Sequence, residues 1–270
     1  MTFPGRLETT VAKKDSVILC WLGQAGFLLK TAKGKIILID PYLSDYVNRV
    51  LEKEHGQGFR RMSAPLFDPS DLKVDILLAS HEHEDHFDID AIPDFLSNRN
   101  FRAYANEASF SLLGRNNIPT DKFTVIKKCD NIQFDEFNLS VVDCDHGDAA
   151  PQAMGFILDF GFTTIYYSGD TSYNLERLKD IVKLSPDFAL LPINGAFGNL
   201  NAIEAAQYAA DLKAKSCIPH HFWTFPLHDT PLGTPAAALD AFPKYAPQCK
   251  LFLAMPGDLL SIGSGGSIAD

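Results

Sequence analysis

Three histidines and one aspartate lie within six residues, directly after an apolar run. The run is VDILLA (74–79), and His81, His83, Asp85 and His86 follow it with the spacing H-x-H-x-D-H. Alternate residues of an extended chain point the same way. His81 and His83 could therefore face one point, while Asp85 and His86 reach a second point nearby. Because imidazole and carboxylate groups suit Zn, Mn, Fe and Ni, the motif predicts a centre for two metal ions.

Such a centre needs further ligands from elsewhere in the chain. Three candidates follow strand-like runs: His146 in VVDCDHGD, Asp170 in YYSGDTS and His221 in CIPHHFW. Asp170, held by a turn at Gly169, could bridge two cations. Each of the three alone is an ordinary residue at the end of a strand. Together with the H-x-H-x-D-H motif, they favour metal binding.

A centre of this kind would carry out hydrolysis. Two cations about 3.5–4 Å apart can share a water molecule and lower its pKa to roughly 7. The resulting hydroxide could attack an ester, a lactone or a phosphodiester. Asp85 is the candidate for proton transfer, because its carboxylate could contact both a metal ion and the water. His228, seven residues after His221, is a candidate for contact with the substrate, and a solvated loop histidine is the alternative interpretation.

The elements that must position these residues form two sets of short strands bounded by Gly, Asp or Pro. The first set covers 16–22, 26–30, 35–39, 74–79 and 102–105, and the second covers 138–143, 153–160, 163–168, 187–192, 216–219 and 250–254. Helical patterns cover 174–184, 202–214 and 235–245, and residues 43–65 indicate a helix and a mobile loop. This order predicts an α/β (α+β) fold of two packed sheets with helices outside. We expect one domain over residues 1–270, with similar halves at about 1–135 and 136–270.

Composition excludes several classes of protein. The net charge of −10 disfavours a nucleic-acid binder, which would carry a basic face. The N-terminal residues lack the apolar segment of a signal peptide, and the longest apolar stretch, VILCWLGQAGFLL, is too short to span a membrane. Five scattered cysteines without C-x-x-C spacing suit reduced thiols, so a cytoplasmic location is expected. The sequence does not decide the oligomeric state, and a homo-oligomer is compatible with it.

Several motifs also resemble those of a known family. SHEHEDHFD, DHGD, YSGDTS and IPHHFWTF resemble the metallo-β-lactamase superfamily, whose fold is an αββα sandwich of two mixed sheets with a two-metal site between them. WLGQAGFLLKT, IDPYLSD, FRRMSAP and GNLNAIEAAQYA are similar to the branch that contains L-ascorbate-6-phosphate lactonase and related metal-dependent hydrolases. The similarity runs from about Trp21 to His228.

The resemblance implies a role for each matching residue. One metal ion would be held by His81, His83 and His146, the other by Asp85, His86 and His221, with Asp170 bridging. His221 is favoured over His220 because the ligand of this branch lies two residues after the proline. Asp40 matches the acidic residue that orients a metal-binding histidine. Arg60 and Arg61 fall where the branch often has a basic residue, and such a pair would clamp a phosphate or carboxylate.

The resemblance further implies a hydrolase with two divalent metal ions, Zn or Mn, with Fe also compatible. The expected reaction is the opening of a small anionic lactone of the sugar-acid phosphate type. A phosphodiesterase acting on a small phosphodiester or phospholipid-like substrate is the alternative. A third hypothesis, a non-catalytic scaffold that keeps the fold, would show a lost ligand, and all seven ligand positions are filled.

Overall fold

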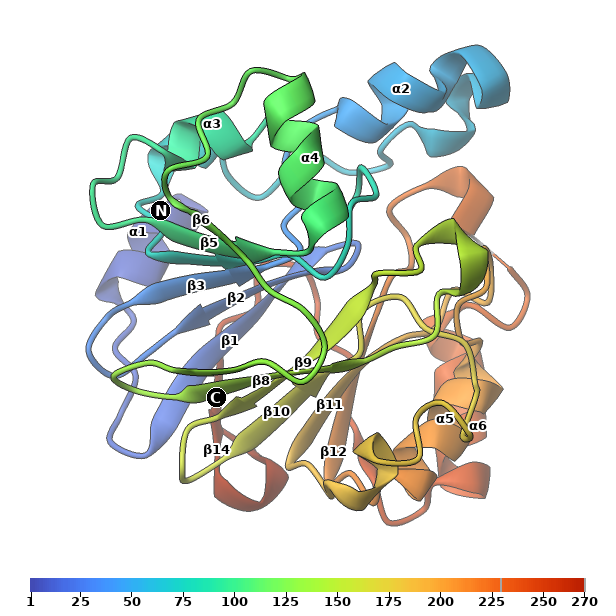
Figure 1. Cartoon of the computed structure of the whole chain (residues 1–270). Coiled ribbons are helices and arrows are strands. Elements are labelled where there is room, and N and C mark those ends of the chain that lie inside the picture. The colour runs from blue at the N-terminus through green and yellow to red at the C-terminus, as the bar shows by residue number, and fades with distance from the viewer. Residues whose placement is uncertain (229, 270) are drawn as a thin grey trace.

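Two β-sheets packed face to face form the centre of the molecule (Figure 1). The computed structural model describes residues 1–228 and 230–269. Within these residues the first sheet has eight strands in the order β15-β14-β1-β2-β3-β4-β5-β6. Its strands are β1 (Ser16–Gly23), β2 (Gly26–Lys30), β3 (Ile36–Ile39), β4 (Ile76–Leu78), β5 (Arg102–Ala105), β6 (Phe123–Val125), β14 (Leu260–Gly263) and β15 (Ser267–Ala269).

The second sheet comes from the later part of the chain. Its seven strands are ordered β13-β12-β11-β10-β9-β8-β7 within the described residues. They are β7 (Asn131–Gln133), β8 (Asn138–Asp143), β9 (Met154–Asp159), β10 (Thr164–Tyr167), β11 (Phe188–Pro192), β12 (Ser216–His220) and β13 (Lys250–Leu251).

Apolar side chains from both sheets meet in the main core. Leu19 and Phe27 of the first sheet belong to the same buried cluster as Phe156 and Leu158 of the second. The rings of Phe27 and Tyr167 lie 6.1 Å apart across the interface. Because helices cover the outer faces, a central strand such as β3 is buried at every residue and has a continuous apolar sequence.

Helices cover the outer face of each sheet (Figure 1). On the first sheet, α1 (Phe3–Thr9), α3 (Ile92–Phe95) and α4 (Glu107–Arg115) place apolar side chains in a second core, and α2 (Tyr46–His55) lies at one end. On the second sheet lie α5 (Ala202–Asp211) and α6 (Pro235–Tyr245). Helix α5 begins where predicted, since Asn201 and Glu204 form a capping box that satisfies the free N–H groups of its first turn. The predicted αββα sandwich is confirmed.

Some elements differ from the prediction. The helix predicted over 174–184 is wrong: the segment forms turns and the short 3-10 helix η4 (Ile181–Lys183), and Arg177 pairs with Asp143 and Asp145 at 3.2 and 2.8 Å. Strands β14 and β15, from the C-terminal part of the chain, join the first sheet, so the sheets do not follow the two sequence halves strictly. Within the described residues no helix has the length and apolarity needed to cross a bilayer.

The strand directions bring the candidate residues to one edge. Strands β3 and β4 are parallel, as are β10, β11 and β12. Strand β8 also runs with β10, because β9 is antiparallel to both. The C-terminal ends of these strands therefore lie at the same edge of each sheet, and the loops that follow them carry Asp40, His81, His146, Asp170 and His221.

Candidate metal centre

The seven predicted ligands lie together between the two sheets. One nitrogen from each of His81, His83 and His146 falls within 4.8 Å of the others. The same holds for ligand atoms of Asp85, His86 and His221. The chain therefore presents two neighbouring groups of three ligand atoms.

Asp170 lies between the two groups. Its Oδ1 is 3.2 Å from Nε2 of His86 and 3.2 Å from Nε2 of His221. Its Oδ2 is 3.8 Å from Nε2 of His146, and Asn199 donates to that oxygen at 2.9 Å. One carboxylate thus faces both groups, as a bridging ligand must.

Neighbouring groups fix the orientation of the imidazole rings. The second nitrogen of His83, Nε2, lies 3.2 Å from the carbonyl oxygen of Ala149, so that nitrogen carries the proton and Nδ1 keeps a lone pair. Nδ1 of His81 contacts the hydroxyl of Ser80 at 2.9 Å. The free Nδ1 of His83 then lies 3.0 Å from Nε2 of His81, and a shared cation would accept both lone pairs.

Asp40 contacts His86 rather than offering a free ligand atom. Its Oδ2 accepts hydrogen bonds from His86 Nδ1 at 2.7 Å, from Tyr167 Oη at 2.6 Å and from the Ser80 hydroxyl. Its Oδ1 accepts from the backbone N–H of Ser80 at 2.7 Å. Asp40, His81 and His86 also satisfy the spacing of a metal site, but these hydrogen bonds already occupy the carboxylate. The contact directs Nε2 of His86 toward Asp170.

The electrostatics of the cluster favour a cation. Burial raises the pKa of Asp170, but His221 and His86 outweigh this effect and hold the pKa well below its usual value. Asp85 behaves in the same way, with burial opposed by His86 and His221. Burial lowers the pKa of His221, yet Asp170 and Asp85 raise it to about 9. The two carboxylates therefore stay charged and attract positive charge to this point.

Two buried polar atoms of the cluster are placed as metal ligands would be. Nε2 of His86 and Oδ1 of Asp170 are buried and lie 3.2 Å apart, but neither atom makes a hydrogen bond of normal geometry within the described part of the chain. Buried polar atoms are nearly always satisfied. Both atoms point at the same place and both are good ligands for Zn or Mn, so the residues present fit a metal centre.

A cavity of about 260 Å³ opens over the cluster. Candidate ligands from both groups, including His83, Asp85 and His221, form its floor. His228 lines it as well, with its ring stacked on His221 at 4.9 Å between centres. Burial, together with the neighbouring His221, lowers the pKa of His228 to about 3, so this side chain is neutral at pH 7.

The two arginines predicted to bind substrate do not line this cavity. Arg61 donates to the backbone carbonyls of Tyr42 and Ser63 at 2.9 and 3.2 Å and stacks over the Tyr42 ring at 4.4 Å. These contacts hold the Arg61 guanidinium against Tyr42 and Ser63. Arg60 is exposed just after the short helix η1 (Gly56–Phe59) and is not among the lining residues either. Neither arginine is placed at the cavity, and the arginine clamp stays a prediction from the family resemblance.

Gln24 lies at the site although its sequence context does not predict it. It lies in the turn between β1 and β2 with a positive φ of 49°, and its side-chain N–H donates to Asp85 Oδ2 at 2.7 Å. Its backbone carbonyl accepts a hydrogen bond from the backbone N–H of His221 at 2.8 Å. The sequence shows only an amide between Gly23 and Gly26 in an apolar strand pair, and its complete burial is seen in the structure.

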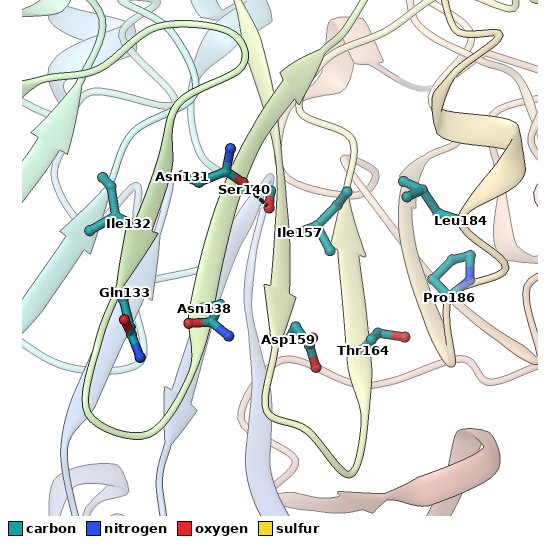
Figure 2. Close-up of a pocket in the computed structure, with 10 residues that line it drawn as sticks. All are labelled: Asn131, Ile132, Gln133, Asn138, Ser140, Ile157, Asp159, Thr164, Leu184 and Pro186. Atoms are coloured by element: carbon teal, nitrogen blue, oxygen red, sulfur yellow. Dashed lines mark hydrogen bonds between the residues drawn. The ribbon is translucent and has the colours of Figure 1, made fainter.

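A larger groove lies elsewhere, on the outer face of the second sheet (Figure 2). It measures about 640 Å³ and is lined by side chains of β7 to β10, such as Asn131, Ser140 and Asp159. Ser140 donates to Asn131 at 2.6 Å. No histidine or cysteine lines this groove within the described residues, so size alone does not make it the reactive site.

Known proteins have similar sequences and folds. Residues 18–221 match the family model described as the beta-lactamase superfamily domain. A UPF0173 metal-dependent hydrolase from Myxococcus xanthus (strain DK1622) is 26% identical over 270 residues, which cover 94% of this chain and 88% of that protein.

Two solved structures show the same fold. Igni18, a metallo hydrolase from Ignicoccus hospitalis, has 20% identity and a TM-score of 0.68, and the match covers 92% of this chain and 98% of that one. An isothiocyanate hydrolase from Delia radicum gut bacteria has 22% identity and a TM-score of 0.69, with 90% and 98% covered. The matched domain takes in all seven candidate ligands, and the chain therefore belongs to the metallo-β-lactamase superfamily.

Proposed function

We propose that this chain is a dinuclear metal-dependent hydrolase that cleaves a small carboxylic ester or lactone. The position of Asp170 between two groups of three ligands carries the proposal. His81, His83 and His146 would hold one ion, Asp85, His86 and His221 the other, and Asp170 would contact both. When bound, two ions of Zn or Mn supply a water molecule that is deprotonated near pH 7.

Two protein groups near that water have further proposed roles, proton transfer and contact with the substrate. Asp85 is partly exposed to the cavity, and only its Oδ2 receives the hydrogen bond from Gln24. The carboxylate could therefore hold the proton released during attack and return it to the leaving oxygen. His228 is neutral and lies beside the floor of the cavity, where its imidazole could contact the substrate oxygen.

A carbonyl substrate fits this cavity better than a phosphate. Enzymes that transfer phosphate commonly place arginine or lysine against its oxygens, and the loop with Arg60 and Arg61 does not provide this. Of the sugar-acid phosphate lactone implied by the family resemblance, the lactone group stays part of the proposal. The phosphate group does not, because no arginine of the described residues is placed to bind it. Relatedness to metal-dependent hydrolases such as the Myxococcus xanthus protein supports hydrolysis as the reaction class.

The cytoplasmic location and the small-molecule partner expected from the sequence stay part of this proposal. All five cysteines are free, four of them buried, which supports a reducing compartment such as the cytoplasm. A small molecule is the proposed partner, because a cavity of about 260 Å³ lies near the lower limit for small-molecule sites.

Metal analysis combined with two substrate classes tests the proposal. The protein is loaded with Zn or Mn, dialysed, and analysed for metal per chain. It is then assayed in parallel with simple lactones, with L-ascorbate 6-phosphate and with bis-p-nitrophenyl phosphate. Two ions per chain with turnover of lactones support the proposal. Turnover of the phosphodiester alone would favour the alternative, and a folded protein that binds no metal would contradict both.

A further inference from the structure

We propose that the substrate is an uncharged molecule whose non-reacting part is apolar. The inference rests on the proposed hydrolase function and concerns the walls of the same cavity. It replaces the anionic substrate expected from the sequence.

One wall is a single face of α2. Val47, Leu51 and His55 are spaced four residues apart and all line the cavity, as expected for one side of a helix. The helix continues into η1, where Phe59 also lines the cavity. Glu52 and Lys53 of the same helix are exposed and do not line it. The helix thus turns its apolar face to the substrate space.

Next to Phe59 the lining is aromatic. Phe197 and Phe225 line the cavity, and their rings lie 5.8 and 5.7 Å from the ring of Phe59. Phe197 is 56% exposed even though it packs on His228 at 5.3 Å. It also adopts a positive φ of 54°, which is unfavourable for a bulky residue. Strained residues of this kind gather at ligand sites, and here the strain holds an aromatic ring at the mouth.

The charges in the cavity oppose a second anionic group on the substrate. No lysine or arginine lines it within the described residues, whereas Glu84, which is not a candidate metal ligand, does. A carboxylate or phosphate held among Phe59, Phe197 and Phe225 would have no lysine or arginine to pair with, and burying an unpaired charge is costly. An apolar group at the same place would instead lose contact with water and gain contact with the rings.

A matched pair of metal-binding probes tests this without any turnover. Butyric hydroxamic acid and succinic monohydroxamate have the same chain length and differ only in a terminal methyl or carboxylate group. Their binding to the Zn-loaded protein is measured by calorimetry. We expect the butyric compound to bind more tightly by at least about tenfold, because only its end avoids an unpaired buried charge.

Two substitutions on one helix sharpen the test. Leu51→Lys adds a cation to the cavity wall and is expected to abolish or reverse the preference. Val50→Lys adds the same cation one residue away, at an exposed position that does not line the cavity, and should leave the preference unchanged. Thermal melting of both variants checks that they fold.

The outcomes separate the two proposals. Equal or tighter binding of succinic monohydroxamate to the metal-loaded wild type overturns the apolar substrate and leaves the metal centre standing. Loss of both bindings together with absence of bound metal overturns the hydrolase proposal and this inference with it. An unchanged preference in Leu51→Lys would show that the probe chain does not lie along α2, which also overturns the inference.

Discussion

Nδ1 of His86 lies 2.7 Å from Oδ2 of Asp40, and both side chains are completely buried. Every partner of the Asp40 carboxylate is a donor, including Tyr167 and the Ser80 backbone. The carboxylate therefore holds a proton on Nδ1 of His86 and leaves Nε2 as the nitrogen that faces Asp170. This relationship joins the end of β3 to the loop after β4.

Asp40→Asn is expected to weaken the proposed metal site of Asp85, His86 and His221. The amide N–H₂ would face donors, so the His86 ring would lose its fixed tautomer. We expect affinity for one of the two ions to fall by about 10–100-fold, measured by competition with a chromophoric chelator. Asp71→Asn, at an exposed carboxylate, is the control. Two unchanged affinities in Asp40→Asn would contradict the orienting role.

Asp85→Asn is expected to slow the chemical step. The amide can still occupy the place of the carboxylate and accept from Gln24, but it cannot take up a proton. We expect kcat to fall by about 10²–10⁴-fold with little change in KM, in assays at saturating metal. Metal content is measured on the same sample, because Asp85 is also a candidate ligand. Unaltered turnover would rule out proton transfer by Asp85.

Gln24→Met tests the donor that holds Asp85. Methionine has a similar length and shape, so the main loss is the 2.7 Å hydrogen bond to Asp85 Oδ2. We expect kcat to fall by about tenfold, with the larger share of the loss in kcat rather than KM. The combined variant Gln24→Met with Asp85→Asn should lose little more than Asp85→Asn alone. Fully additive losses would show that Gln24 acts on another group.

The sequence was sufficient to predict the fold and the candidate ligands for a local reason. Each ligand lies in a loop that follows a short apolar strand, and the C-terminal ends of these strands meet at one edge of each sheet. Gln24 could not be found in this way, because its closeness to Asp85 depends on the packing of two loops that are distant in sequence. The residues of the cavity walls could not be predicted either, because they come together only through packing. Leu51 and Phe197 belong to separate segments, and the stacking of Arg61 on Tyr42 depends on a fold that spacing does not reveal.

Asp187 provides a test of stability that is independent of the metal site. Its carboxylate accepts from Lys215 Nζ at 2.6 Å and from the Thr164 backbone at 2.9 Å, and its side chain is 11% exposed. Burial raises the pKa of Asp187, but the hydrogen bonds from Lys215 and Thr164 outweigh this, so the pKa is lowered. A lowered pKa in the folded state stabilises the protein at pH values above the unfolded value of about 3.9. This contribution is lost as the pH falls through the lower folded pKa.

Asp187→Asn should therefore destabilise the protein at neutral pH by about 1–3 kcal/mol, the usual value for hydrogen bonds to a charged group. The difference from wild type should shrink as the pH falls below about 4, because Asp187 is then becoming protonated in the wild type. Urea unfolding with a chelator present measures both quantities, and the shared titration of the histidine cluster cancels in the difference. Asp180→Asn removes a surface ion pair with Lys183 and should leave stability unchanged at either pH. If the difference in free energy of unfolding between wild type and Asp187→Asn stays constant with pH, the negative charge of Asp187 does not contribute to stability. Only its packing and uncharged hydrogen bonds would then stabilise the contact between β10 and β11.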